Sequence, residues 1–328
     1  MKRLLHRGAL CGLLGMSACE IPFEIEQKGT SLIYFQAIAN QDTFVVYPRY
    51  AAAIGQPLEN DVTFDVTLQV NGEKIPLDGS EKGVRHCRYA FREGDQVSVT
   101  VGAEGLPTVE GLTTVMEKPV VADMSWKEVR THEIQATQVT LTLQHTPQDD
   151  EYYAIQIPST FTTYYSDSTF SEYSYYETPG YILSSTESFN IDLDDFLQLE
   201  YSPGRILRNG NYRPFVLLAR KHFEGNKYSF YLNSYDIGFR DEQANKATPV
   251  GAKKTYRFHL YRLSPEFYRY AKALYQSNFD FLSNMGLTPA NFTYTNNSNG
   301  LGFTGNAIAC DPVELVVEKN FSEGSVPE

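Results

Sequence analysis

The sequence predicts a mainly β protein, built as two tandem β-sandwich domains of the immunoglobulin-like kind, with one C-terminal α-helix packed on the second domain. Composition supports this fold class: 23 tyrosines and 20 phenylalanines stand against 5 methionines and 1 tryptophan, which is typical of strand-rich proteins. Apolar and polar residues also alternate in many short runs, and turn residues separate these runs about every ten residues. The 328 residues are enough for two domains, each with its own core.

The first predicted domain spans residues 31–115. From Val62 to Val70 apolar and polar residues alternate, and the run ends at Asn71-Gly72, a residue pair typical of a tight hairpin turn. The run "QVSVTV", residues 96–101, repeats the alternation between glycine-containing turns. We expect both runs to be strands that bury one face.

Residues 116–126 are predicted to be a linker, and residues 127–328 the second domain. This domain contains five further alternating runs: "QVTLTLQHT", "EYYAIQIP", "NYRPFVLLARK", "KYSFYLNSYD" and "TYRFHLYRLS". One helix is predicted over about residues 265–285, because Ser264 can cap its first turn, Pro265 suits the first helical position and Gly286 can end it. We expect this helix to pack on the sheet of the second domain.

The N-terminal residues 1–18 are predicted to be a lipoprotein signal peptide. Three basic residues precede an apolar stretch that is too short to span a bilayer: Lys2, Arg3 and Arg7. The order Leu-Gly-Met-Ser-Ala-Cys at residues 14–19 resembles a bacterial lipobox, in which the cysteine is lipidated and becomes the mature N-terminus. Cys19 is therefore the predicted lipidation site and residues 19–30 the tether, the alternative being an ordinary cleaved signal with an incidental cysteine.

Two cysteines remain after this assignment, Cys87 and Cys310. A compartment outside the inner membrane permits them to form a disulfide, which would join the end of the chain to its first domain. Sequence alone does not give the distance between the two Cβ atoms. The alternative of two separate thiols is therefore equally open.

The formal net charge of −12 argues against nucleic acid as a partner. Both nucleic acid and an anionic bilayer surface attract basic proteins, because the protein must offset phosphate charge. We therefore expect contact with a membrane only through the lipid anchor.

The segment "TFTTYYSDSTFSEYSYYETPGY", residues 160–181, contains six tyrosines and two phenylalanines. Rings alternate with small or acidic residues on both sides of Ser166-Asp167-Ser168, which predicts a hairpin. The rings have two open interpretations: they hold the hairpin together, or they form an exposed patch that contacts a partner or a sugar. The candidate binding patch consists of five tyrosines: Tyr164, Tyr165, Tyr173, Tyr175 and Tyr176.

No catalytic signature, metal site or cofactor motif is expected. The sequence contains no His-Glu-x-x-His, Gly-x-Ser-x-Gly, phosphate loop or dinucleotide fingerprint. An acidic group at Asp192, Asp194 and Asp195 has no glycine-containing loop behind it, so ordinary surface carboxylates explain it better than a calcium site or a glycosidase pair.

Three segments carry a resemblance to a known family: the strand-to-helix junction "SPEFY" at residues 264–268, "NNSNGLGF" at residues 296–303, and "YAFREGDQVSVTVGAEGLPTVEGLTTV" at residues 89–115. Together they resemble the family called domain of unknown function 4249, which comprises lipoproteins of Bacteroidota. The ending around Asn306, Ala307 and Cys310 departs from the pattern expected for that family.

The resemblance implies a lipid-anchored protein of the outer membrane, facing the cell surface and commonly encoded beside a TonB-dependent transporter, with no established activity. The expected function is therefore a non-catalytic binding or accessory component for a TonB-dependent transporter. Two alternatives remain open: an envelope hydrolase that acts on glycans or peptides, and a structural surface component.

Overall fold

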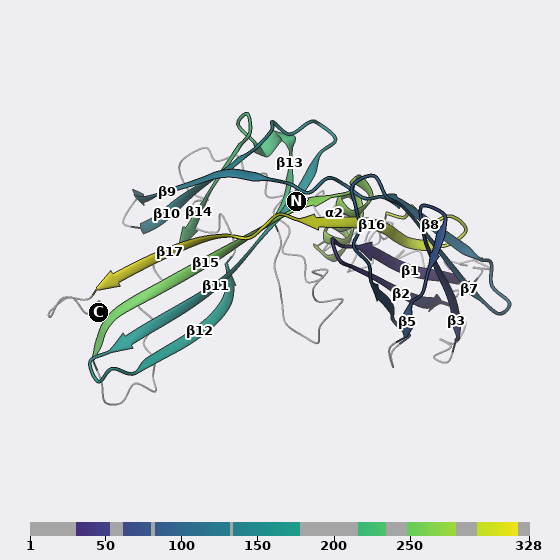
Figure 1. Cartoon of the computed structure of the whole chain (residues 1–328), viewed down its shortest axis with the longest axis horizontal. Coiled ribbons are helices and arrows are strands. Elements are labelled where there is room, and N and C mark those ends of the chain that lie inside the picture. Colours follow the sequence, from purple (N-terminus) through teal and green to yellow (C-terminus); the bar gives the residue numbers. More distant parts are fainter. Residues whose placement is uncertain are drawn as a thin grey trace, which may run out of the picture.

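The computed structural model describes residues 31–52, 62–79, 83–131, 134–177, 216–233, 248–279 and 294–320. These residues include three β-sheets and a helix at the centre of the molecule (Figure 1), so the prediction of a mainly β fold is confirmed. The predicted signal peptide, Cys19 and the tether lie outside the described residues, as does the acidic group at 192–195. No helix of the described part combines the length and the apolar character needed to cross a bilayer.

The first sandwich packs a four-stranded sheet against one end of a ten-stranded sheet. The four-stranded sheet has the order β4 (Glu73–Ile75), β3 (Phe64–Val70), β7 (Gln96–Ala103) and β8 (Val109–Thr114). The facing end of the large sheet has the order β16 (Leu301–Ala309), β1 (Leu32–Ala39), β2 (Thr43–Ala51), β6 (Arg85–Arg88) and β5 (Asp78–Gly79). Fully buried side chains such as Phe35, Leu68 and Val99 fill the space between them.

The tight hairpin predicted at Asn71-Gly72 joins β3 to β4. Val70 pairs with Glu73, so the loop between them contains two residues. Asn71 and Gly72 have φ angles of 52° and 83°. Asparagine and glycine are the residue types that most readily adopt left-handed backbone, which explains why the sequence predicted this turn correctly.

The second sandwich packs a three-stranded sheet against the other end of the large sheet. The three-stranded sheet has the order β14 (Lys227–Asn233), β10 (Ile134–Leu143) and β9 (Val121–Thr131). The large sheet contributes β12 (Phe170–Glu177), β11 (Tyr152–Tyr165) and β15 (Pro249–Leu263), with β13 (Val216–Ala219) beside β11 and β17 (Val313–Asn320) beside β15. The 3-10 helix η2 (Arg220–His222) follows β13. Because β9 begins at Val121, this strand starts inside the predicted linker of residues 116–126.

Strand β16 joins the two sandwiches. It pairs in parallel with β1, from Tyr34 opposite Leu301 to Ala39 opposite Asn306, and antiparallel with the end of β15. Ile308 is part of the first core. Residues 301–309 thus complete the first sandwich, whereas the predicted boundaries placed all of residues 127–328 in the second domain. Strand pairing between residues so distant in the chain leaves no local sequence signal.

The "NNSNGLGF" segment holds β16 close to β1. At Gly302, where φ is 101°, an added Cβ would lie 1.9 Å from the carbonyl oxygen of Phe35. Asn297 Nδ2 donates a hydrogen bond of 3.0 Å to the same oxygen, and Thr304 Oγ1 donates one of 2.9 Å to Asn297 Oδ1. This asparagine- and glycine-rich segment therefore has a structural role in the described fold.

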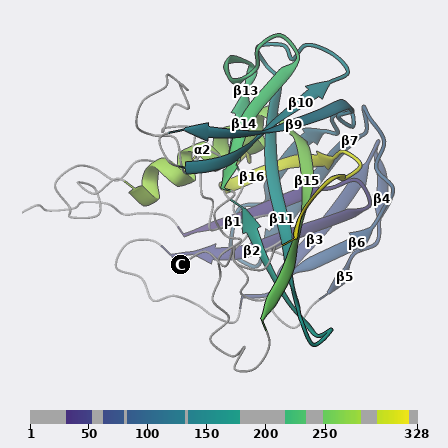
Figure 2. The ribbon, with the colours of Figure 1, turned by 90° about the vertical axis from the view of Figure 1, so that its left-hand side faces the viewer.

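Helix α2 (Pro265–Phe279) covers the place where the two sandwiches meet (Figure 2). The predicted cap is confirmed, since the backbone N–H of Phe267 donates to Ser264 Oγ over 3.3 Å. The buried side of the helix contacts Phe303 of β16 and Leu263 of β15. As predicted, the helix packs on strands β15 and β11 of the second sandwich, and it also packs on β16. Residues 280–285 of the predicted helix lie outside the described residues.

Asn306 links this helix to the first sandwich. Its side chain is fully buried and donates hydrogen bonds to Thr113 Oγ1 (2.9 Å) and to the carbonyl oxygen of Thr114 (2.7 Å). Its backbone N–H donates to Ser264 Oγ over 3.2 Å. One asparagine thus connects β8, β16 and the N-terminus of α2.

The two cysteines are free thiols rather than a disulfide. Cys87 is buried in the first core and Cys310 in the second, so the two side chains belong to different clusters. Burial raises the pKa of both thiols. Of the two alternatives left open by the sequence, the structure shows separate thiols.

Candidate functional site

The tyrosine-rich segment forms the predicted hairpin. Strands β11 and β12 pair antiparallel from Ile157 opposite Glu177 to Tyr164 opposite Phe170. The turn between them is closed by a hydrogen bond of 2.9 Å from the backbone N–H of Tyr165 to the carbonyl oxygen of Thr169. Asp167 Oδ1 accepts the backbone N–H of Thr169 over 3.0 Å and so stabilises the turn.

This hairpin is not an isolated ribbon, because β15 pairs with the other side of β11. The pairing runs from Tyr152 opposite Leu263 to Tyr165 opposite Pro249. At the turn, the backbone N–H of Ser166 also donates to the carbonyl oxygen of Thr248 over 2.9 Å. Three strands with a shared face are stable where two are marginal. Strands β12, β11 and β15 therefore form a three-stranded arm whose tip lies far from the first sandwich (Figure 1).

One face of the arm presents an aromatic pair at its tip. Tyr164 and Phe170 lie directly opposite each other across the strands, so their side chains share a face. Their exposed fractions are 42% and 65%. We call these two residues the tip pair. Phe170 was not selected from the sequence, although the alternation around the turn places it across from Tyr164.

The other face of the arm carries a second set of rings. Phe161 lies opposite Tyr173; Phe161 is buried, whereas 62% of Tyr173 is exposed. Tyr165 is also buried, and its hydroxyl lies 3.1 Å from Ser171 Oγ. This face therefore mixes rings that hold the hairpin with one exposed ring.

The five tyrosines of the predicted patch do not form one surface. Tyr164 and Tyr165 are consecutive in a strand and therefore point to opposite faces. The buried Tyr165 must be removed from the patch. Tyr175 and Tyr176 pair through their backbones with Ser159 and Pro158, and their side chains lie outside what the structure describes.

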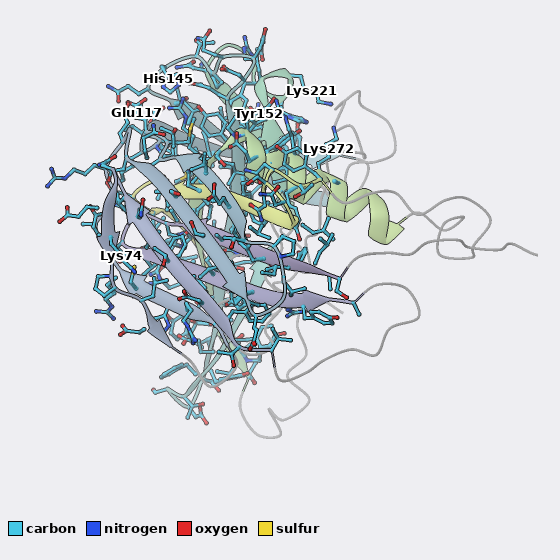
Figure 3. The ribbon with its side chains drawn as sticks, turned by 90° about the vertical axis from the view of Figure 1, so that its right-hand side faces the viewer. Lys74, Glu117, His145, Tyr152, Lys221 and Lys272 are labelled. Atoms are coloured by element: carbon cyan, nitrogen blue, oxygen red, sulfur yellow. The ribbon has the colours of Figure 1, made fainter. Side chains whose placement is uncertain are left out.

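A partly buried charge cluster lies at the junction of the two sandwiches, and its residues were not predicted from the sequence. Arg262, near the end of β15, donates to Glu151 Oε1 over 2.5 Å and to Glu117 Oε2 over 3.0 Å. Glu151 Oε2 is further contacted by His145 Nε2 at 2.9 Å and by the hydroxyl of Tyr153 at 3.0 Å. Glu117 and His145 mark this cluster in Figure 3.

Glu151 is held in its charged form. Burial alone would raise the pKa of its carboxyl group, but hydrogen bonds from His145 and from the backbone of Gln148, together with the charge of Arg262, lower it below its ordinary value. Burial and the neighbouring charge of Glu151 raise the pKa of Tyr153. A general acid needs the opposite arrangement, a carboxyl group whose pKa is raised. We therefore interpret the cluster as structural.

Within the described part of the chain, no group of three or more histidine, cysteine, aspartate or glutamate side chains is arranged so that it could hold a metal ion. The site with the clearest functional character in this part is therefore the tip of the arm. Its exposed rings are held by backbone pairing rather than by contact with one another alone.

Comparisons with known proteins give one family match. The family described as "Domain of unknown function (DUF4249)" matches residues 20–307. No curated protein matches the sequence. Among solved structures, one from Corynebacterium diphtheriae, provisionally described as a membrane anchored protein, is 12% identical, with a TM-score of 0.21. The alignment covers 70% of this chain and 54% of that one, so the chain spans about half the length of that protein.

Proposed function

Because the chain belongs to the family known as domain of unknown function 4249, we propose that it is a non-catalytic lipoprotein of the outer membrane, anchored through Cys19, that binds a partner at the cell surface. The proposed partner is a TonB-dependent transporter, as the resemblance to Bacteroidota lipoproteins implies. The protein would act as an accessory component of that transporter.

The tip pair is the observation that supports partner binding. Tyr164 and Phe170 place two large rings on one exposed face at the end of a three-stranded arm. Rigid aromatic side chains lose little conformational entropy on binding and are frequent hot spots of protein interfaces. A structural surface component that binds no partner would gain no stability from two large rings exposed to water.

The hydrolase alternative is not favoured by any described arrangement. The two carboxylates that approach each other near the junction, Glu117 and Glu151, are both ion-paired to Arg262. The structural surface component remains as an outcome of the following test.

The test is a cross-linked pull-down of the tagged, lipidated full chain from its own outer membranes, with co-purifying proteins identified by mass spectrometry. We expect a TonB-dependent transporter in fixed ratio. The Tyr164→Ala/Phe170→Ala double variant should lose about tenfold or more of the captured partner, because two interface rings are removed. Leu112→Ala is the matched control, since Leu112 is 66% exposed but lies in β8 of the other sandwich.

Two results would contradict the proposal. Recovery of no partner in fixed ratio with the parent chain would favour the structural surface component. Full recovery with the double variant, with its melting temperature unchanged, would show that the tip pair does not bind the partner.

A further inference from the structure

The outer edge of β12 is a long strand edge of the large sheet in the described part of the chain. Strand β12 stands at one end of the ten-stranded order, and within the described residues it pairs only with β11. The opposite end of the sheet is β5, which has two residues. A short edge strand offers little for another chain to pair with, whereas β12 offers eight residues.

Strand β12 carries two glutamates but neither lysine nor proline, the residues that most often protect an edge. Its sequence, "FSEYSYYE", contains no lysine, arginine, proline or glycine. By contrast, the edge strand β9 of the three-stranded sheet carries Lys127, and β17 carries Lys319. Natural sheets use lysine, proline and bulges to prevent edge pairing, so their absence here is compatible with an edge that pairs.

The exposed rings of β12 lie on both faces of the strand. Phe170 belongs to the face of the tip pair, and Tyr173 to the opposite face. A flat partner surface can cover only one of these faces. A strand added beside β12 continues both faces, so its side chains contact both rings.

We propose that this added strand is β12 of a second copy of the chain, paired antiparallel about a twofold axis perpendicular to the sheet. Tyr173 lies at the axis, opposite its own copy. The remaining pairs in this register are Phe170 with Tyr176, Ser171 with Tyr175, and Glu172 with Ser174.

Charge and ring positions select this occupant and this register. No glutamate lies directly opposite a glutamate, although like charges across a strand pair are destabilising. The register also places both exposed rings, Phe170 and Tyr173, opposite an aromatic residue, and aromatic cross-strand pairs are stabilising. A symmetric pair of this kind closes on itself and buries both edges at once.

The chain offers a direct test by cysteine cross-linking, because Cys87 and Cys310 are buried. Residues directly opposite each other in an antiparallel pair have Cα atoms about 4.5–5.5 Å apart, which a disulfide can span. The full-length Tyr173→Cys variant is oxidised in its own membranes with copper phenanthroline and analysed by non-reducing electrophoresis. The salt concentration is kept near 0.15 M, because the chain is acidic, with a formal net charge of −12 over its full sequence, and repulsion between two copies is then screened within about 8 Å.

We expect Tyr173→Cys to give a covalent dimer of twice the chain mass. Phe170→Cys, in the same strand, should give none, because the two copies of residue 170 would stand about 20 Å apart. Leu112→Cys on β8 and the parent chain should also give none, and the parent reports any cross-link through the N-terminal cysteines. Adding Ser171→Lys to Tyr173→Cys should abolish the dimer, because it introduces a protected edge.

Three results would overturn the proposal: no dimer from a Tyr173→Cys chain that melts like the parent, equal dimer from Leu112→Cys, or a cross-link only to a protein of different mass. The first two of these results concern pairing between two copies at Tyr173, whereas the transporter test measures capture of a different protein by the Tyr164→Ala/Phe170→Ala variant. Failure of the dimer and failure of the transporter proposal are thus distinguishable.

Discussion

At the scale of single residues, Glu151 is a position where the fold depends on a buried charge. Its carboxylate and the guanidinium of Arg262 are both about nine-tenths buried, and Glu117, the other partner of Arg262, is more than half exposed. Removing one partner of a buried ion pair leaves the other charge poorly compensated, which costs about 3–5 kcal/mol. We therefore expect Glu151→Gln to lower the free energy of unfolding by about that amount in urea titrations at pH 7.

Glu314→Gln is the matched control, because Glu314 forms an exposed ion pair with Arg257 and exposed pairs contribute about 1 kcal/mol or less. The pH dependence gives a second readout. The folded-state pKa of Glu151 lies below its ordinary value, so the stabilisation is fully present above the pKa of the unfolded chain and is lost as the pH falls through the folded pKa. The difference between parent and Glu151→Gln should shrink as the pH falls below about 4.3; a constant difference would contradict the assignment.

The two buried thiols make a second prediction at this scale. Cys87 and Cys310 are buried and free, and burial raises the pKa of each, so little thiolate is present at neutral pH. Iodoacetamide should leave both residues unmodified in the native protein and should alkylate both in guanidinium without reductant. Mass spectrometry of the peptides reads the result, and labelling that requires a reductant would reveal a disulfide instead.

At the scale of elements, the arm and β16 differ in how far sequence could predict them. The hairpin was predictable because its two strands are adjacent in the chain and ring alternation surrounds a turn at Ser166-Asp167-Ser168. The division of its rings between two faces also follows from alternation, once the register of Tyr164 opposite Phe170 is known. The third strand of the arm, β15, lies far along the chain, and local pattern does not reveal which strand pairs with β11.

The parallel pairing of β1 with β16 could not be predicted from local sequence patterns either, because the two strands lie far apart in the chain. Residue 34 pairs with residue 301, and no turn residue reports such a contact. The charge cluster was missed for a related reason, because Glu117 and Glu151 lie more than 100 residues before Arg262 in the chain and only the tertiary fold brings them together. The quoted "NNSNGLGF" segment was visible in the sequence, but its role needed the structure.

That segment makes a prediction for the β1–β16 pair. An added methyl group at Gly302 would meet the carbonyl oxygen of Phe35 at 1.9 Å, on backbone with a φ of 101°. We expect Gly302→Ala to lower the melting temperature strongly, by about 10 °C or more, because the strands must separate to admit the methyl group. Gly105→Ala is the control: its φ of 74° carries the strain of left-handed backbone but nothing lies within 4 Å of the added atom, so its effect should be far smaller. Equal decreases in melting temperature for the two variants would show that left-handed backbone strain, rather than the contact with Phe35, causes the loss of stability.

At the scale of the whole molecule, the topology argues against two independent folding units. Strand β16 stands between β15 and β1 in the large sheet, so both sandwiches share one continuous sheet (Figure 1). Ile308 belongs to the first core, and Leu315, a few residues later, belongs to the second. The sheet of the first sandwich is therefore complete only when β16, near the end of the chain, pairs with β1. Pairing between strands so distant in sequence is expected to slow folding.

Truncation tests this coupling. A chain that ends at Pro312 keeps β16 and loses β17, so we expect the amides of Val97 and Val99 in the first core to stay protected from hydrogen exchange. A chain that ends at Thr293 also loses β16, which removes the parallel partner of β1, the contact of Ile308 and the hydrogen bonds of Asn297 and Asn306 to the first sandwich. Exchange at Val97 and Val99 should then become fast, because exchange protection reports the free energy of opening. Slow exchange at these amides in the shorter chain would mean that residues 31–115 form a stable sandwich by themselves. The predicted first domain would then be an independent folding unit, although the large sheet continues beyond its boundary.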